Sequence, residues 1–386
     1  MSVYVKHLNI NLCKPLLDVP LSRLDGCAKI IQASPGKDGF SCSWTKRKAE
    51  MKAMVLRELG EPEQLRWEDF PEPKPGPHEV MIRLKAAALN HRDVWIRRGL
   101  YAGIRLPVIL GSDGSGDVVA VGDRVPVALV GKSVVIFPVL DWGPDDQATG
   151  PSFRILGMPD NGTYAQYVTV PVTNAFPKPD SLSFEQGAAL ALAGLTAFRA
   201  LVTRAAVQPG ESVVITGIGG GVACFALQIA VWLGAQVFVT SSSDEKLERA
   251  QSLGASGGAN HEMTDWTATI RSLNQGRRPD VVIDSIGGNI FNNALELVRP
   301  GGRIITYGAT TGPASQFEIR RVFWKQLNVL GSTMGNAKEF QAVLDLYGRQ
   351  HFNPVLDKIF CLSDAAAAHR RMEAREQFGK IVLRID

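Results

Sequence analysis

The first regular pattern along the chain is a series of short apolar segments separated by glycine and proline. A proline-rich turn at residues 71–77 separates the first two segments, and residues 140–161 are polar and loop-like. Short strands with glycine and proline between them predict a partly closed β-structure. The predicted strands are residues 51–56, 80–86, 115–121, 132–137 and 162–170.

The pattern changes near residue 181, where predicted helices and strands begin to alternate. Ser183 and Gln186 have the spacing of a capping box and predict the start of a helix that runs to about residue 203. The alternation predicts a parallel sheet with helices on both faces. Its predicted strands are residues 213–216, 236–240, 280–284 and 303–307, its predicted helices are residues 221–233, 244–253 and 289–298, and residues 379–385 predict a last strand.

Residues 1–50 differ from the rest of the chain. They show little periodicity and contain eight Lys and Arg against four Asp and Glu, an excess that equals the whole formal charge of +4. We expect an extension without fixed structure. A mitochondrial transit peptide is a second interpretation, although Asp18, Asp25 and Asp38 are unusual in such peptides. A translation start upstream of a natural one at Met51 is a third.

The composition argues against several classes of protein. Hydrophobic residues make up 45% and charged residues 21%, as in ordinary globular proteins. The chain has no dense basic stripe, so we expect no nucleic-acid partner. No apolar run approaches the roughly 20 residues that span a bilayer, so we expect no membrane partner. Five cysteines without zinc or disulfide spacing, and a start unlike a secretory signal, predict a cytoplasmic protein.

A glycine-rich turn links the strand at residues 213–216 to the helix that follows it. Glycine permits unusual backbone angles and close approach of a diphosphate, and the N–H groups at the helix start attract the anion. The strict G-x-G-x-x-G pattern requires glycine at position 222, where this chain has valine. A Gly-rich turn of another α/β protein is the alternative to a dinucleotide site. The predicted dinucleotide-binding residues are Gly217, Gly219, Gly220, Gly221 and Val222.

The end of the second strand of the alternating region indicates which dinucleotide binds. NAD sites place an acidic residue about 20 residues after the first glycine, where it binds the ribose 2′-hydroxyl. This chain has Ser241 and Ser242 in that region, and their hydroxyls can donate to a 2′-phosphate. Lys246 follows and can pair with the phosphate as a positive charge. The predicted cofactor is therefore NADP(H), although the serines also fit a capping box for the next helix.

These features make residues 51–386 similar to the medium-chain dehydrogenase/reductase superfamily, the relatives of zinc alcohol dehydrogenases and quinone oxidoreductases. The resemblance implies an α/β fold with a Rossmann doubly wound parallel sheet and a GroES-like, partly closed β-barrel as catalytic domain. It places the catalytic domain at residues 51–190 and 333–386 and the NADP-binding domain at residues 191–332. The segments that carry the resemblance are residues 111–116, 118–122, 193–197, 217–222 and 379–383.

The positions that match the family's zinc ligands depart from the zinc-binding members. Those members hold the catalytic metal with cysteine and histidine, whereas this chain has Asn90, Ser112 and Leu192. Leucine cannot bind a metal, and asparagine and serine are poor ligands for Zn²⁺. Residues 140–161, where the family's four-cysteine zinc lobe would lie, contain no cysteine. We therefore expect no metal.

The resemblance also implies the site residues. The candidate catalytic residues are Asn90 and Asp93. The amide of Asn90 can donate to a carbonyl or quinone oxygen, or it only fixes its own loop, and Asp93 is expected to orient that loop. For Ile286 and Met334 the alternative is simple core packing. The positions expected to bind the cofactor are His91, Thr196, Ser285, Ile286, Tyr307, Gly308, Ala309, Met334 and Lys380.

The implied reaction is hydride transfer from NADPH to a carbonyl, an enone or a quinone without zinc. Two other functions stay open. One is a zinc-dependent alcohol dehydrogenase, and the other is a non-catalytic NADPH-binding redox sensor. The expected partner is a small-molecule substrate, and the resemblance also implies a homodimer.

Overall fold

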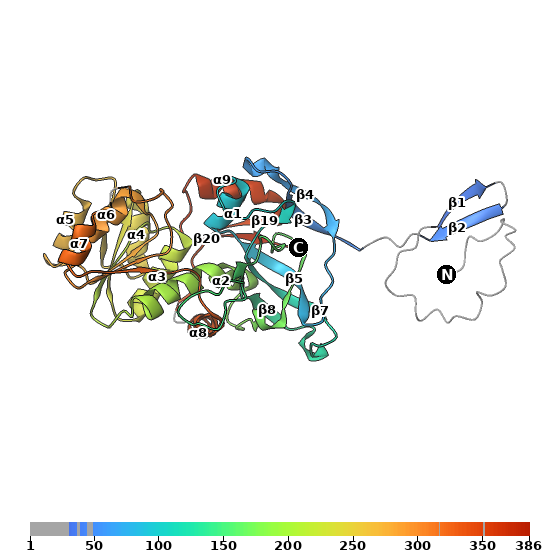
Figure 1. Ribbon diagram of the computed structural model, residues 1–386, viewed down its shortest axis with the longest axis horizontal. Helices are drawn as coiled ribbons and strands as arrows, with labels where there is room; N and C mark the ends of the chain where they lie inside the picture. Colours follow the sequence, from blue (N-terminus) through green and yellow to red (C-terminus); the bar gives the residue numbers. More distant parts are fainter. Residues whose placement is uncertain (1–30, 37–38, 45–48, 316, 350–351) are drawn as a thin grey trace. The chain divides into compact units, whose positions relative to one another are not determined.

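The computed structural model describes residues 31–36, 39–44, 49–315, 317–349 and 352–386, and the chain divides into two units, residues 1–50 and 51–386 (Figure 1). In the first unit, β1 (Ile31–Gly36) and β2 (Gly39–Trp44) pair as an antiparallel hairpin. This hairpin differs from the expected extension without fixed structure, since pairing of two adjacent short strands needs no long apolar period. The rest of that expectation, with the transit-peptide interpretation, falls outside the described residues.

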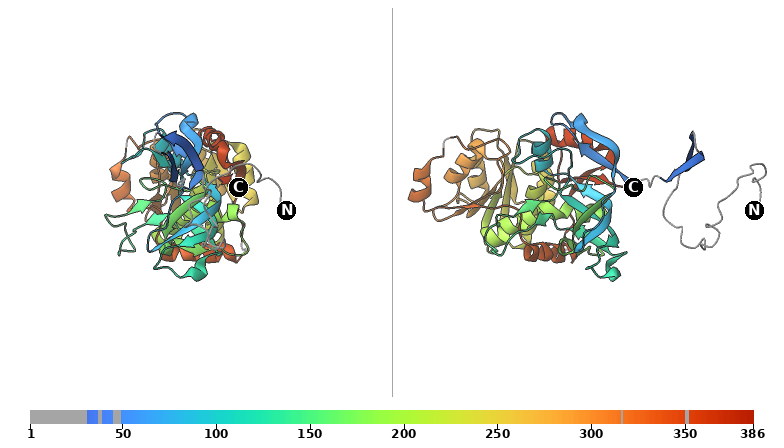
Figure 2. Two further views of the ribbon diagram at one scale, coloured as in Figure 1. Left: turned by 90° about the vertical axis from the view of Figure 1, so that its right-hand side faces the viewer. Right: turned by 45° about the vertical axis from the view of Figure 1, so that its right-hand side comes forward.

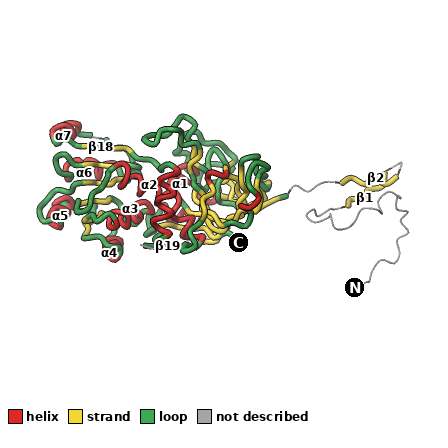
Figure 3. The backbone as a smooth tube through the Cα atoms, turned by 90° about the horizontal axis from the view of Figure 1, so that it is seen from below, coloured by secondary structure: helices red, strands yellow, loops and turns green. Residues whose placement is uncertain are grey.

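One part of residues 51–386 is a parallel sheet with helices on both faces (Figure 3). Within the described residues its order is β15-β14-β13-β16-β17-β18, with parallel neighbours throughout. This order confirms the predicted Rossmann sheet. Its strands are β13 (Ser212–Ile215), β14 (Gln236–Ser241), β15 (Gly257–Asn260), β16 (Val281–Asp284), β17 (Arg303–Thr306) and β18 (Asn328–Gly331). Its helices are α3 (Gly221–Trp232), α4 (Asp244–Ser252), α5 (Trp266–Leu273), α6 (Gly288–Leu297) and α7 (Ile319–Trp324).

The other part is a partly closed β-barrel, which lies at the opposite end of residues 51–386 in the right-hand view of Figure 2. Strand β7 (Asp113–Val121) pairs antiparallel with β5 (Glu79–Ala88), and a Cβ at Gly116 would lie 2.1 Å from the carbonyl oxygen of Arg83, which explains the glycine. Its strands are β3 (Glu50–Leu56), β4 (Leu65–Pro71), β5 (Glu79–Ala88), β6 (Val108–Ile109), β7 (Asp113–Val121), β8 (Ser133–Ile136), β9 (Val139–Leu140), β10 (Arg154–Ile155), β11 (Tyr167–Pro171), β12 (Ala175–Pro177), β19 (Leu356–Cys361) and β20 (Lys380–Arg384). Short 3-10 helices lie at Pro62–Gln64, Val127–Leu129, Val172–Asn174 and Leu362–Asp364.

Helix α2 (Phe184–Phe198) connects the two parts. The capping box of Ser183 and Gln186 starts it as predicted, and a π-helix at Arg199–Arg204 continues it. It packs against β5 and β7 on the barrel side and against α3 and α8 (Ala337–Gly348) on the other. Residues 184–204 are long and apolar enough to cross a membrane by length and composition, which the sequence reading did not recognise. The most apolar 18-residue stretch of this segment is 72% buried within the protein, as in a core helix.

Several helices and strands and one strand start differ from the sequence predictions. Helices α1 (His91–Arg97), α5, α7 and α9 (Ala365–Glu373) were not predicted, since each has fewer than ten residues and shows no clear apolar period. The 12-residue helix α8 and the strands β4, β6, β9, β10, β12, β15, β18 and β19 were also missed. The strand predicted from residue 162 begins only at Tyr167. The first residues of the predicted segment instead bond to the end of β6 and the turn after it. The N–H of Gly162 donates to the carbonyl of Ile109 at 2.7 Å, and the N–H of Thr163 donates to the carbonyl of Gly111 at 3.0 Å.

Candidate active site

The glycine turn joins β13 to α3 at the carboxyl edge of the parallel sheet. Gly217 and Gly219 have φ angles of 70° and 107°, a region that favours glycine. Gly220 is the N-cap of α3, and no side chain caps this helix start. The first N–H groups of α3 therefore stay available to an anion, as a dinucleotide diphosphate requires.

The close packing around this turn also requires glycine at positions 219 and 221. A Cβ at Gly219 would lie 2.8 Å from Cδ of Lys246, and one at Gly221 would lie 2.6 Å from Cδ of Lys380. The carbonyl of Gly219 accepts from the N–H of Gly379 at 3.0 Å. The turn therefore packs against the segment that leads into β20, and the glycines admit two lysine stems as well as leaving the helix start open.

The residues after β14 lie near the predicted 2′-phosphate position. The hydroxyl of Ser241 accepts from the N–H of Ser243 at 3.1 Å, and Ser242 is exposed. Ser243 caps α4, which bears out the capping interpretation for that residue. The carboxylate of Asp244 accepts from the Asn260 amide at 3.0 Å, so this acidic group is already engaged by a neutral partner. Lys246 lies half-buried, and its Nζ donates to the backbone of the segment before β20.

Two basic residues near this position were missed in the sequence. The carbonyl of Arg375 accepts from Nζ of Lys246 at 2.5 Å. Burial lowers the pKa values of His91 and His261, and the positive charge of Arg375 adds to the effect on both. His261 itself lies at the end of β15, with its Nδ1 3.1 Å from the hydroxyl of Thr240. No signal in the sequence distinguishes Arg375, because it follows an arginine-rich helix end that resembles a solvated surface.

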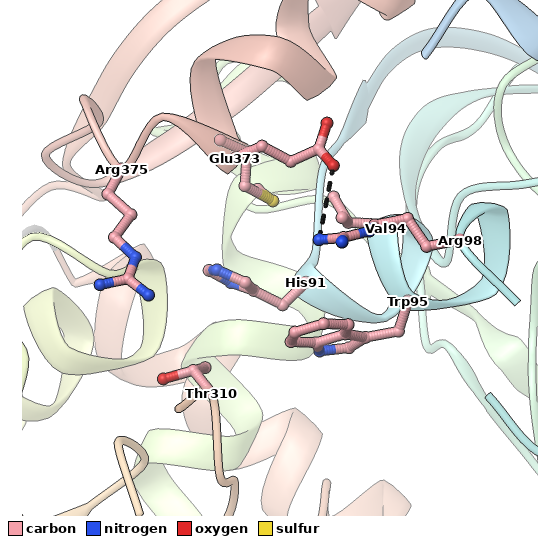
Figure 4. Close-up of a pocket in the computed structure, with 8 residues that line it drawn as sticks. His91, Val94, Trp95, Arg98, Thr310, Glu373 and Arg375 are labelled. Atoms are coloured by element: carbon pink, nitrogen blue, oxygen red, sulfur yellow. Dashed lines mark ion pairs between the residues drawn. The ribbon is translucent and has the colours of Figure 1, made fainter. Parts of the chain in front are cut away.

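A small pocket of about 100 Å³ lies where α1, the loop after β17 and the end of α9 meet. Figure 4 shows His91 between Arg375 and the side chains of α1, with Thr310 beside them. Burial, together with the positive charges of Lys380 and Arg375, lowers the pKa of His91 to about 4. His91 is therefore neutral at pH 7 and lies between cations, as a phosphate-binding histidine would.

Asn90 lies at the start of α1 in a buried polar cluster. Its Nδ2 donates to Asp113 at 2.9 Å, and its Oδ1 accepts from Nζ of Lys380 at 2.7 Å. Nζ of Lys380 also donates to Asp113 at 2.9 Å and to the carbonyl of Leu89 at 2.6 Å. The other carboxylate oxygen of Asp113 accepts from the N–H of Leu192 at 2.9 Å. All three ammonium hydrogens of Lys380 therefore have acceptors inside the protein, and its predicted contact with the cofactor stays a prediction.

Asp93 lies beneath Asn90 and is fully buried. Its Oδ2 accepts from the backbone N–H of Asn90 at 2.9 Å and from the hydroxyl of Tyr164 at 3.0 Å. Burial raises the pKa of Asp93, against the opposing effects of Arg92 and these two hydrogen bonds. A direct catalytic contact with substrate is not supported for Asp93, because the side chain is enclosed. Its position is that of a residue that orients Asn90.

The residues at the metal-ligand positions do not fit a zinc ion. The hydroxyl of Ser112 accepts from Nη1 of Arg92 at 2.7 Å and donates to a backbone carbonyl. Asn90 already binds the ammonium of Lys380, and the side chain of Leu192 has no donor atom. Two cations thus lie beside the would-be ligands, which disfavours a third. The described part of the chain also contains no group of three or more His, Cys, Asp or Glu that could hold a metal.

The remaining predicted cofactor residues gather at the carboxyl ends of β16 and β17. Asp284 connects them to the glycine turn, since its carboxylate accepts from the hydroxyl of Thr216 at 2.6 Å and from the N–H of Gly287 at 3.0 Å. The two strand-end loops are joined by the bond from Thr310 N–H to the Ser285 carbonyl. The loops contain Ser285, Ile286, Tyr307, Gly308 and Ala309, and Thr196 and Met334 are buried on α2 and after β18. Their contact with a cofactor stays a prediction.

Comparison with known proteins identifies similar folds and sequences. The family described as "Alcohol dehydrogenase GroES-like domain" matches residues 76–180, and "Zinc-binding dehydrogenase" matches residues 221–349. A zinc-type alcohol dehydrogenase-like protein of Leptosphaeria maculans is 37% identical, over 81% of this chain and 92% of that protein. A quinone oxidoreductase of Pseudomonas aeruginosa is 32% identical, over 86% of this chain and 99% of that protein. A solved structure named as an NAD-dependent alcohol dehydrogenase is 41% identical with a TM-score of 0.83, over 87% of this chain and 100% of that chain.

Proposed function

Because this chain belongs to the medium-chain dehydrogenase/reductase superfamily, whose members bind nicotinamide cofactors, we propose that it is an NADPH-dependent reductase of carbonyl, enone or quinone compounds that works without a metal. The observation that carries the proposal is that none of the three positions where the family binds its metal offers a free ligand. Asn90 and Ser112 bind the cations Lys380 and Arg92, and Leu192 has no ligating atom. Hydrogen-bond donors are then left to stabilise negative charge on the reduced oxygen.

The preference for NADPH is supported by the charges around the end of β14. The acidic residue nearest the end of β14, Asp244, accepts a hydrogen bond from the amide of Asn260 at 3.0 Å. Lys246, Arg375 and His261 supply positive charge or hydrogen-bond donors that favour a 2′-phosphate. The rival is NAD, since a solved relative carries that cofactor in its name. Comparison of the dissociation constants of NADPH and NADH separates the two.

The residues of this chain would bind and orient the cofactor and the acceptor, and the cofactor when bound supplies the hydride. The N–H groups at the start of α3, with His91 and Arg375, would hold its phosphates. The amide of Asn90 keeps one hydrogen after its bond to Asp113, and this hydrogen can donate to the oxygen of the acceptor. One such donor contributes about 3 kcal/mol to the transition state. The proton that completes the reduction would come from solvent.

The proposed homodimer is supported by an apolar surface on α7. Ile319, Phe323 and Trp324 are 64%, 63% and 83% exposed, an unusual density for the surface of a monomer. This helix directly precedes β18, the edge strand of the parallel sheet, whose free side can pair with another strand. A second copy of this chain satisfies both features at once.

A panel assay tests the proposed reaction. The purified full chain is analysed for metal content and mixed with NADPH or NADH and a series of carbonyl, enone and quinone acceptors. We expect NADPH consumption without stoichiometric metal. Stoichiometric zinc whose removal by a chelator abolishes turnover would instead support the zinc-dependent alcohol dehydrogenase. Binding of NADPH without consumption by any acceptor would support the redox sensor.

The Asn90→Ala variant tests the assignment of the donor. We expect turnover to fall on the order of 10²- to 10³-fold while NADPH affinity changes little, because the lost hydrogen bond matters in the transition state. Steady-state kinetics with the best acceptor and fluorescence titration with NADPH measure the two quantities. Unchanged turnover removes Asn90 from the active set.

A further inference from the structure

Lys380 is placed by the long-range pairing of the last strand. It is the first residue of β20, which pairs with the end of β5, so that Val382 faces Ala88. This register brings Nζ of Lys380 to the residues that follow β5. Gly379 makes the entry possible, since its φ is 106° and a Cβ there would lie 2.3 Å from the carbonyl oxygen of Val355.

The ammonium of Lys380 is fully committed inside the protein. The residue is 3% exposed, and its three hydrogens go to Leu89, Asn90 and Asp113 at 2.6, 2.7 and 2.9 Å. Asp113 is fully buried, and it also accepts from Asn90 and Leu192. A buried ion pair is tolerated when its hydrogen-bonding capacity is met in this way. Lys380 therefore has no hydrogen left for a phosphate or for a proton transfer.

These two charges determine which way the amide of Asn90 points. An ammonium can only donate and a carboxylate can only accept, so Oδ1 must face Lys380 and Nδ2 must face Asp113. The reversed amide would place N–H groups against Lys380 and an oxygen against Asp113. The second hydrogen on Nδ2 has no acceptor among the residues that the structure describes. Its direction is thus set by the ion pair.

We propose that Lys380 is the positioning residue of this active site, a built-in cation that takes the electrostatic place of the family's catalytic metal and aims the second Asn90 amide hydrogen at the acceptor oxygen. The inference rests on the proposed reduction of a carbonyl, enone or quinone oxygen. The ammonium also polarises the amide through Oδ1, and this makes the N–H a stronger donor, as in other hydrogen-bond chains.

The Lys380→Met variant removes the charge and keeps most of the side-chain stem. We expect turnover to fall on the order of 10²-fold, as for loss of an aligned donor, while the dissociation constant of NADPH changes less than about threefold. The matched control is Arg384→Met on the same strand, an exposed cation that pairs with Glu185 outside the site. Retained turnover with weakened NADPH binding would overturn the proposal and make Lys380 a cofactor ligand.

A second readout does not depend on turnover. With ¹⁵N-asparagine labelling, the side-chain amide signal of Asn90 is assigned by its loss in Asn90→Ala. We expect this signal to shift in Lys380→Met and to stay in place in Arg384→Met. If the wild-type protein reduces no acceptor while the signal responds as expected, the proposed function fails and the positioning of Asn90 stands. If the wild-type protein is active and Lys380→Met changes neither the signal nor turnover, the positioning role of Lys380 is wrong while the proposed function stands.

A charge-balanced variant covers the case in which Lys380→Met does not fold. Lys380→Met with Asp113→Asn removes both charges, so no buried charge is left unpaired. We expect this protein to fold and to keep NADPH binding, while turnover stays low because either orientation of the Asn90 amide becomes possible. Full turnover in this double variant would refute the proposal.

Discussion

Replacing Glu339 by glutamine tests how the loop at residues 141–153 is held. Arg199, in the π-helix after α2, contacts both carboxylate oxygens of Glu339 through Nη1, at 3.0 and 2.8 Å. Its Nη2 donates to the carbonyls of Asp146 and Gln147 at 3.0 and 2.9 Å, and its guanidinium lies 4.8 Å from the ring centroid of Trp142. One cation therefore connects α2, α8 and the loop.

The magnitude follows from burial of the pair. The side chains of Arg199 and Glu339 are 3% and 9% exposed, so a neutral residue at position 339 leaves a guanidinium buried without its counter-charge. Removing one partner of a buried pair costs about 3–5 kcal/mol. The pair of Lys338 and Asp146, on the same helix and loop, is exposed to solvent and is expected to contribute little to stability. Lys338→Met is therefore the matched control.

Urea unfolding followed by circular dichroism measures these free energies, and limited proteolysis reports on the loop. We expect Glu339→Gln to lower the free energy of unfolding by about 3 kcal/mol or more and to expose the loop to cleavage. Arg199→Met combined with Glu339→Gln should lose less than the sum of the single variants, because no unpaired charge remains. Strict additivity, or a loss in Glu339→Gln no larger than in Lys338→Met, would refute the reasoning.

Three further predictions concern the cofactor site and the surface. In the free protein the pKa of His91 is about 4, and a bound phosphate would raise it. NADPH binding should therefore be accompanied by proton uptake that grows as the pH falls towards 4, and over that range it should strengthen relative to His91→Gln, as calorimetry in buffers of different ionisation enthalpy would show. Arg375→Gln should weaken NADPH more than NADH, on the order of tenfold in the ratio of dissociation constants measured by fluorescence titration. Phe323→Asp with Trp324→Asp should convert a dimer to a monomer in sedimentation velocity, because it charges the exposed apolar face of α7.

Each of these has an outcome that contradicts it. Equal proton uptake by the wild-type protein and His91→Gln would place the phosphate away from His91. The lowered pKa of His91 also makes the stability of the folded protein depend on pH. The unfolded imidazole titrates near 6.5, so His91 lowers stability as the pH falls from about 6.5 towards 4. Proportional losses for both dinucleotides in Arg375→Gln would assign this residue to the shared diphosphate. If the wild-type protein sediments as a monomer, the proposed homodimer is wrong.

Much of the fold follows from local sequence patterns. The strand, glycine turn and helix at residues 212–232 were predicted because glycine at positive φ and a helix start are properties of neighbouring residues. The capping box of Ser183 and Gln186 is equally local. The poor fit to zinc could also be predicted, since it depends on the chemical identities of Asn90, Ser112 and Leu192 rather than on their geometry.

The connections within the site depended on tertiary structure. Lys380 and Asn90 are 290 residues apart in the chain, and their contact exists because β20 pairs beside β5. No periodicity encodes such a pairing, so the sequence alone did not place Lys380 beside Asn90 and overlooked Arg375. Backbone angles and apolar periods act over a few residues, and they determined the elements. The partners of buried charges are set by which distant segments pack together, and only the folded chain determined those.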